Sequence, residues 1–224
     1  MACATFAVVH QNDFVELRKS TLSLHDVAIV CCFGNGATFR DIWDDWDQSP
    51  AYRAHACINV KEKSLNQAKY VQGVLDTPNT HPDHLAGSDT EHTAHLLDGV
   101  VAQLTKHIPC RTWILHGASG GCVTAVSLAR ALLASGHRIL GILADCGVPG
   151  SGEALPHSVP ISIFRCSWDK YWNKHETHLF EVWCRLGYFV NHTSSNRKQH
   201  AWVVDNTCIG MFLGWFEDTF GLRI

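Results

Sequence analysis

A serine among small residues offers the clearest chemistry in this sequence. Ser119 is the centre of a Gly-x-Ser-x-Gly pattern at residues 117–121. A serine on a sharp turn between a strand and a helix needs small neighbours, because the backbone is strained and the two elements pack closely. Such a turn exposes the hydroxyl, and the N–H groups of the following helix face developing negative charge. The pattern predicts a nucleophile, and the alternative is a glycine-rich structural turn.

A serine hydroxyl needs a base and an orienting carboxylate to act as a nucleophile. In an open parallel sheet all three groups come from loops at the carboxyl ends of the strands. Asp169 follows an expected strand at 159–166, and His200 follows another at 187–191. We therefore predict Ser119 as nucleophile, His200 as base and Asp169 as acid. The alternative for Asp169 is a surface carboxylate.

The predicted base and the predicted acid each have an alternative in the sequence. His192 comes directly after the last expected strand and is an alternative base, although a polar run at 194–198 separates it from His200. His200 is followed by the apolar residues 201–204, which could pack its loop back on the sheet. Asp145 follows the preceding expected strand and is an alternative acid.

The elements that must position these residues alternate along the chain. Apolar runs predict strands, and helical spacing or capping signals predict helices between them. This alternation predicts an α/β fold, a mostly parallel central sheet with helices on both faces, in one domain spanning 1–224. The expected strands are 4–10 and 14–18 (an antiparallel pair), 27–32, 54–60, 111–115, 139–144, 159–166 and 187–191. The expected helices are 39–46, 88–108, 122–135, 178–186 and 205–220. The helix at 88–108 has one apolar stripe, and Ser135-Gly136 is a stop signal for the helix at 122–135. The stripe consists of Leu97, Val100, Val101, Leu104 and Ile108.

Composition narrows the class of protein. The chain has 224 residues, of which 46% are hydrophobic and 17% charged, with a net charge of -3. This balance is typical of a globular protein with a sizeable core and argues against nucleic-acid binding. Apolar runs stay below the roughly 18 residues of a transmembrane helix, so no transmembrane segment is expected. Residues 1–9 are apolar but short and lack a basic start, so a signal peptide is not expected.

Cysteine and histidine are both abundant. The ten cysteines form no Cys-x-x-Cys pattern, and several fall inside expected strands and helices. They are interpreted as buried thiols in a reducing compartment, which predicts a cytoplasmic protein. Among 15 histidines, His81, His84, His92 and His95 share one segment. A metal site needs ligands that converge, whereas one polar segment is more often solvated surface. We expect no metal.

Four motifs give the chain a family resemblance. Beside the serine pattern, residues 159–169 resemble the strand and acid loop of the α/β-hydrolase superfamily, and residues 186–190 with 199–202 resemble its last strand and histidine loop. The order Ser, Asp, His is also the order of that superfamily. From about residue 27 onward, the chain is most similar to the small lidless group of acyl-protein thioesterases, carboxylesterases and dienelactone hydrolases.

The resemblance also implies an oxyanion hole and an activity. Phe33-Gly34-Asn35-Gly36 stands where the family has His-Gly-x-Gly, with Phe33 in place of histidine. By this match the backbone N–H groups of Asn35 and Gly120 form the hole. The family implies hydrolysis of a small acyl ester or thioester, without a cofactor. The alternatives are an acyltransferase with the same triad and a ligand-binding protein of the same fold without turnover.

Overall fold

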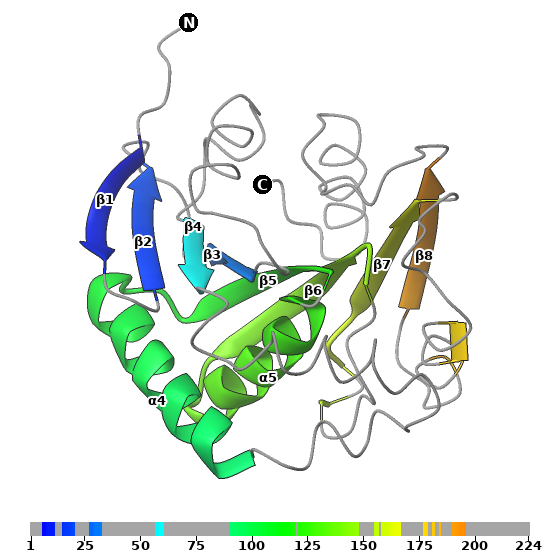
Figure 1. Ribbon diagram of the computed structural model, residues 1–224. Helices are drawn as coiled ribbons and strands as arrows, with labels where there is room; N and C mark the ends of the chain where they lie inside the picture. Colours follow the sequence, from blue (N-terminus) through cyan, green and yellow to red (C-terminus); the bar gives the residue numbers. More distant parts are fainter. Residues whose placement is uncertain are drawn as a thin grey trace, which may run out of the picture.

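A computed structural model describes the strands, two long helices and the turns that join them (Figure 1). The described residues are 6–11, 15–20, 27–32, 57–60, 90–119, 121–147, 155–156, 158–166 and 190–195, with helical backbone also at 177–178, 181 and 184. The helical positions at 178, 181 and 184 fall within the expected helix at 178–186. The expected helices at 39–46 and 205–220 lie outside the described residues.

The described strands form one eight-stranded sheet in the order β1-β2-β4-β3-β5-β6-β7-β8. The pairs β1–β2 and β2–β4 are antiparallel, whereas all pairs from β4 to β8 are parallel. The mostly parallel central sheet predicted from the alternating pattern is therefore confirmed. The strands are β1 Phe6–Gln11, β2 Val15–Ser20, β3 Val27–Cys32, β4 Cys57–Val60, β5 Thr112–Ala118, β6 Arg138–Asp145, β7 Ile161–Cys166 and β8 Val190–Ser195.

Two strand boundaries differ from the prediction in ways that affect the site. β5 continues to Ala118, so the strand includes the first glycine of the serine pattern. β8 begins at Val190 and ends at Ser195, whereas the sequence predicted a strand at 187–191. The polar run at 194–198 was expected to follow the last strand, but backbone pairing with β7 holds Ser194 and Ser195 in the sheet. Strand ends are the least certain part of a pattern, because pairing is decided by the neighbouring strand.

The long helices α4, Thr90–His107, and α5, Gly121–Ala134, lie on the same face of the sheet (Figure 1). α5 packs on β5 and β6, and α4 packs beside α5. The stripe predicted for α4 is buried at Val100, Val101, Leu104 and Ile108. These residues join one hydrophobic cluster with the sheet.

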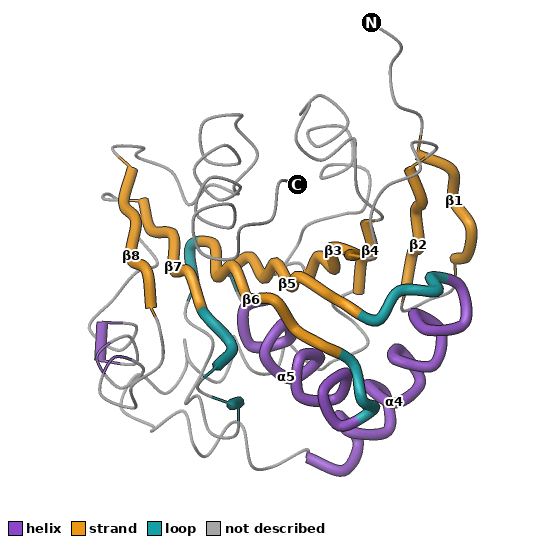
Figure 2. The backbone as a smooth tube through the Cα atoms, turned by 180° about the vertical axis from the view of Figure 1, so that it is seen from behind, coloured by secondary structure: helices purple, strands orange, loops and turns teal. Residues whose placement is uncertain are grey.

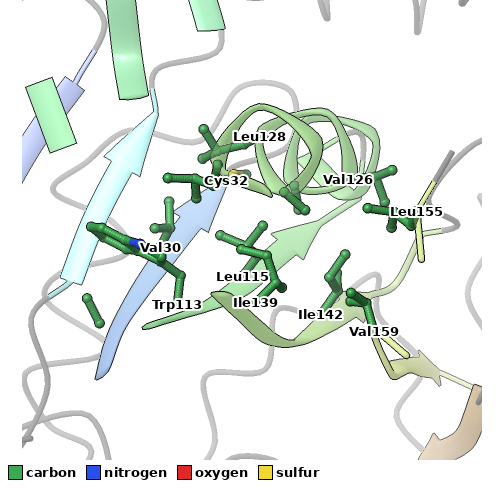
Figure 3. Packing of buried hydrophobic residues seen from close by; sticks show 14 of the residues in the cluster. Val30, Cys32, Trp113, Leu115, Val126, Leu128, Ile139, Ile142, Leu155 and Val159 are labelled. Carbon is green, nitrogen blue, oxygen red and sulfur yellow. The ribbon is translucent and has the colours of Figure 1, made fainter. Parts of the chain in front are cut away.

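Among the described residues, the core beneath α5 is mostly aliphatic and includes Trp113. Trp113 and Leu115 of β5 and Leu128 of α5 belong to one hydrophobic cluster between the sheet and α5 (Figure 3). Trp113, Leu115 and Leu128 are all fully buried. Each fully buried side chain of this size stabilises the fold by about 1.5–3 kcal/mol through removal of apolar surface from water. The strand before the serine is thus anchored by packing along its length.

The opposite face of β5 and β6 is also buried. Ile114, His116 and Ala118 alternate with the residues that face α5, and their exposed fractions are only 0%, 2% and 3%. Burial on both sides explains why the strands read as continuous apolar runs rather than alternating patterns. A polar histidine in such a run is therefore a buried polar group that needs a partner.

The tube view from behind shows the same arrangement, with the carboxyl end of β5 entering α5 through a short turn (Figure 2). At the other end of α5, Gly136 has a φ of 81°. Its N–H donates to the carbonyl of Leu133, and the N–H of His137 donates to that of Leu132, both at 3.0 Å. These two bonds form a Schellman motif, in which glycine accommodates the left-handed backbone. The predicted helix stop at Ser135-Gly136 is confirmed.

Candidate active site

Ser119 occupies the turn between β5 and α5 in a left-handed backbone conformation. Its φ is 53°, which is uncommon for a residue other than glycine and costs ~1–3 kcal/mol. Two main-chain bonds hold it: its N–H donates to the carbonyl of Asp145 at 2.7 Å, and its carbonyl accepts the N–H of Cys122 at 3.1 Å. Ser119 is partly exposed, although both residues preceding it are buried. The predicted strand–serine–helix arrangement is present.

Two glycines make this tight turn possible. A Cβ built on Gly117 would lie 2.5 Å from the Cα of Cys122 and 2.6 Å from the carbonyl oxygen of Gly121. A Cβ on Gly147 would overlap the carbonyl oxygen of Ser119 and lie 2.9 Å from the Cys122 sulfur. Real Cβ atoms do not approach backbone atoms so closely, so both positions need glycine. Gly117 was expected in this role from the sequence, whereas Gly147 was not.

Cys122 fills the space beneath the turn. Its thiol donates to the carbonyl of Gly117 at 3.2 Å and lies 3.8 Å from that of Asp145. The side chain is fully buried. Cys122 therefore links the carboxyl end of β5 with the end of β6.

The carboxyl end of β6 lies directly beside Ser119. Asp145, the last residue of β6, is fully buried, and its carboxylate Oδ2 lies 3.7 Å from Nε2 of His116. The next residue, Cys146, is the other non-glycine residue with a positive φ among the described residues, at 50°. Its N–H donates to the carbonyl of Phe164 at 2.8 Å, which joins the end of β6 to β7. Two neighbouring strands thus end in left-handed residues at the same edge.

The sheet determines how far the other candidates are from Ser119. His192 lies inside β8, paired with Ile163, so the expectation that it follows the last strand is wrong. β8 is three strands away from β5, which corresponds to about 14 Å at the usual strand spacing. This span is longer than a histidine side chain and a serine hydroxyl can bridge together. While His192 is paired in β8, its position argues against a role as the base.

The remaining predicted site residues are Asn35, Gly120, Asp169 and His200, and all four lie outside the described residues. The ends of the strands that lead into two of them are described. β7 ends at Cys166 and β8 at Ser195, and these two residues pair with each other in parallel. Asp169 and His200 therefore follow strands that end at the same edge as β5.

His116 and Gly147 are residues that sequence patterns did not single out. The signal for His116 was a polar residue within the apolar run of β5, and the signal for Gly147 was a glycine directly after an expected strand. Neither signal identifies a partner. His116 meets Asp145, and Gly147 meets Ser119, only because β5 and β6 are adjacent in the sheet.

Five cysteine side chains are described, and all five are thiols. Four of them, Cys32, Cys110, Cys122 and Cys146, are buried, as expected from the sequence. Cys184 is exposed, although it was expected inside a packed helix. Burial raises the pKa of the Cys32 thiol far above its usual range, which leaves that thiol unreactive.

The described residues contain neither a cluster of metal ligands nor a helix suited to span a membrane. No group of three or more histidine, cysteine, aspartate or glutamate side chains that could hold a metal occurs among the described positions. His81 and His84 lie outside the described residues, as do the side chains of His92 and His95. Within the described part of the chain, none of the helices combines the length and the apolar character of a membrane span.

Similar proteins are found through the structure of this chain and not through its sequence. No family model matches the sequence, and no curated protein matches it. Solved structures do match. A carboxylesterase from Bacillus cereus superposes with a TM-score of 0.62 at 13% identity, covering 92% of this chain and 94% of the esterase. A predicted CIB-like hydrolase from Thermoplasma acidophilum superposes with a TM-score of 0.59 at 14% identity, covering 96% of this chain and all of the other.

A third similar structure is an α/β serine hydrolase without a lid from Xanthomonas campestris. It superposes with a TM-score of 0.53 at 11% identity and covers 96% of this chain and 92% of its own. Residues 146–160, which join β6 to β7 here, are too few to form an added domain. With the strand order, the serine turn and these three structures in agreement, the chain has the α/β-hydrolase fold.

Proposed function

We propose that this protein is a serine hydrolase that cleaves carboxylic esters or thioesters through an acyl-enzyme on Ser119. The observation that carries the proposal is the left-handed serine between β5 and α5, at the carboxyl edge of a parallel sheet. A strained residue of this kind persists only when its surroundings over-determine it, and such residues cluster at active sites. The carboxylesterase from Bacillus cereus, which has a similar fold, makes an ester the first substrate class to test.

The reaction uses three side chains and two backbone groups. His200 accepts the Ser119 proton as the hydroxyl oxygen attacks the acyl carbon, and the N–H groups of Asn35 and Gly120 stabilise the resulting oxyanion. His200 then gives its proton to the departing alkoxide or thiolate. Water attacks the acyl-enzyme by the same route, and the acid and free serine are released. No cofactor takes part.

The choice of His200 as base is supported by the extent of β8. The strand continues to Ser195 and holds His192 three strands from β5, which favours a base from the residues after the strand. His200 is the histidine that follows. We assign it the base, with Asp169 as the residue that orients its imidazole. Asp145 is the alternative acid, because it ends the strand beside β5.

A fluorophosphonate probe tests the proposal. We expect covalent labelling of the native protein, with the modified peptide mapping to Ser119 by mass spectrometry. Ser119→Ala should abolish labelling, whereas Ser135→Ala, which removes an exposed serine hydroxyl at the far end of α5, should label like the wild type. Labelling at another residue, or none, would reject the serine hydrolase and favour a ligand-binding protein.

A second measurement separates hydrolysis from acyl transfer. A panel of p-nitrophenyl esters of increasing acyl length is hydrolysed with and without an added alcohol acceptor. Free acid as the main product in both cases supports the hydrolase. An acyl ester of the added alcohol as the main product would favour an acyltransferase that uses the same serine.

A further inference from the structure

The pair formed by His116 and Asp145 lies beneath the serine turn, and the proposed reaction does not use His116. His116 belongs to the middle of β5, and Asp145 ends the adjacent strand β6. The exposed fractions are 2% for His116 and 0% for Asp145. Their side chains approach to 3.7 Å between Nε2 and Oδ2. A buried carboxylate is costly unless a donor or a positive charge faces it, so this approach supports the orientation of both side chains.

Asp145 is also bound to the serine turn through its main chain. Its carbonyl accepts the N–H of Ser119 at 2.7 Å, a short bond for this type. The thiol of Cys122, at the start of α5, lies 3.8 Å from the same carbonyl. One residue thus has its side chain directed at β5 and its carbonyl directed at the turn that follows β5.

The strain at both strand ends makes this link important. Ser119 and Cys146 have φ values of 53° and 50°, and each directly follows one of the paired strand residues Ala118 and Asp145. A small rotation of Asp145 would move its carbonyl away from the Ser119 N–H. The left-handed serine would then lose a bond that stabilises it against the ordinary right-handed conformation.

From this chain of contacts we infer that His116 is a positioning residue for Ser119. It holds the Asp145 carboxylate, and the Asp145 carbonyl in turn fixes the left-handed turn and the direction of the serine hydroxyl. His116 does not touch substrate in this scheme. The inference extends the proposed function, but the geometry of the turn can be measured without any activity.

Amide hydrogen exchange followed by NMR tests the link directly. In His116→Leu we expect the Ser119 N–H to exchange at least about tenfold faster than in the wild type. The N–H of Ile142, which lies three residues before Asp145 in β6, donates to the Pro160 carbonyl. It serves as the internal control, and its exchange rate should not change. His116→Gln places an N–H near the position of Nε2 and should restore most of the protection.

A matched variant separates positioning from general loosening. Ile114→Ala removes a fully buried side chain from the same face of β5, two residues before His116. It should lower the melting temperature, because it leaves a cavity in the core, without selective exchange at Ser119. Equal acceleration at Ser119 and Ile142 in His116→Leu, or selective acceleration in Ile114→Ala, would overturn the inference. So would an unchanged Ser119 rate in His116→Leu.

A second substitution applies if His116→Leu does not fold. Asp145→Asn keeps the size of the side chain and every backbone atom but removes the carboxylate charge that faces His116. The Ser119 N–H should exchange severalfold faster, and an unchanged rate would overturn the inference.

Probe labelling connects the inference to the reaction. In His116→Leu the maximal rate of fluorophosphonate labelling should fall about tenfold or more, with little change in the probe concentration that gives half the maximal rate. If the wild type is not labelled while exchange at Ser119 responds as expected, the proposed function fails and the positioning role stands. If Ser119 is labelled but its amide exchange rate is the same in His116→Leu as in the wild type, the positioning role fails and the proposed function stands.

Discussion

The two ends of β5 are held in different ways. At the amino end, the contacts are ordinary: the Arg138 N–H donates to the Arg111 carbonyl at 2.8 Å, and the indole N–H of Trp113 donates to Nδ1 of His137 at 3.1 Å. At the carboxyl end, Ser119 is left-handed and its turn is packed so closely that Gly117 cannot carry a side chain. One end is a stable junction, and the other keeps a costly conformation.

This difference shows that the backbone strain lies at the carboxyl end of β5, in Ser119. A turn built only to connect a strand with a helix has easier solutions, because glycine at position 119 would remove the backbone cost. Keeping a serine there favours a role for its hydroxyl.

The largest effect is expected from His200, the proposed base. His200→Ala should lower kcat for an ester substrate by roughly 10³-fold or more, as loss of a triad member does. His192→Ala is the matched control, because it alters a histidine within β8, and it should change kcat little. Steady-state kinetics with a p-nitrophenyl ester measures both. The reverse result would identify His192 as the base and would require β8 to be shorter in solution.

Gly117→Ala should disrupt the carboxyl end through backbone overlap. The new methyl group would meet the Cys122 Cα at 2.5 Å, and neither backbone can move without distorting the turn. We expect a loss of about 3 kcal/mol in the free energy of unfolding, at the upper end for overpacked sites. Urea denaturation measures this loss.

Gly99→Ala provides the control for glycine substitution itself. Gly99 is exposed in α4, and a Cβ there would have no atom within 4 Å. The change should raise the free energy of unfolding by about 0.5–1 kcal/mol, because alanine favours the helix. If Gly117→Ala were as well tolerated as Gly99→Ala, the close packing of the turn would be disproved.

At the amino end, Trp113→Phe removes one hydrogen bond and leaves most of the buried ring. The Nδ1 of His137 loses its donor, and a smaller ring occupies the core position. We expect a cost of about 1–3 kcal/mol from the lost bond and the gap. Labelling of Ser119 should stay at the wild-type rate, because the change lies at the opposite end of β5. A strong loss of labelling at equal folded fraction would contradict the independence of the two ends.

The smallest effect is a pH dependence of stability from His137. Burial, with a further contribution from the Arg111 charge, lowers its pKa below the ordinary value of 6.5. The folded state therefore favours the neutral imidazole, whose Nδ1 accepts the Trp113 N–H. The unfolded chain takes up the proton first as pH falls. Stability from this group is complete above pH 6.5 and declines as pH falls toward the lower folded pKa.

His137→Asn isolates this contribution. The amide oxygen can accept the Trp113 N–H but does not titrate. As pH is lowered from 8 to 5, the wild type should lose the stability that depends on neutral His137, whereas the variant should not. The free energy of unfolding of the variant minus that of the wild type should therefore become more positive. A difference between the two proteins that stays constant over this range would refute the assignment.

The sequence determined the parts that depend on neighbours along the chain. Alternating apolar runs and helical stripes predicted the parallel sheet and α4, and the glycine after Ser135 predicted the end of α5. The serine turn was predicted because small residues next to each other are a local signal. Propensity, periodicity and turn chemistry act within a few residues, so they can be deduced from the sequence alone.

Contacts between strands were decided only by the tertiary structure. The extent of β8, which places His192 within the sheet, depends on backbone pairing with β7. Likewise, His116 faces Asp145 and Gly147 packs on Ser119 only because β5 and β6 are neighbours. The register between strands depends on packing across the whole sheet, and no local pattern encodes it. The serine turn was therefore predictable from the sequence, but the contacts that support it from β6 were decided by the fold.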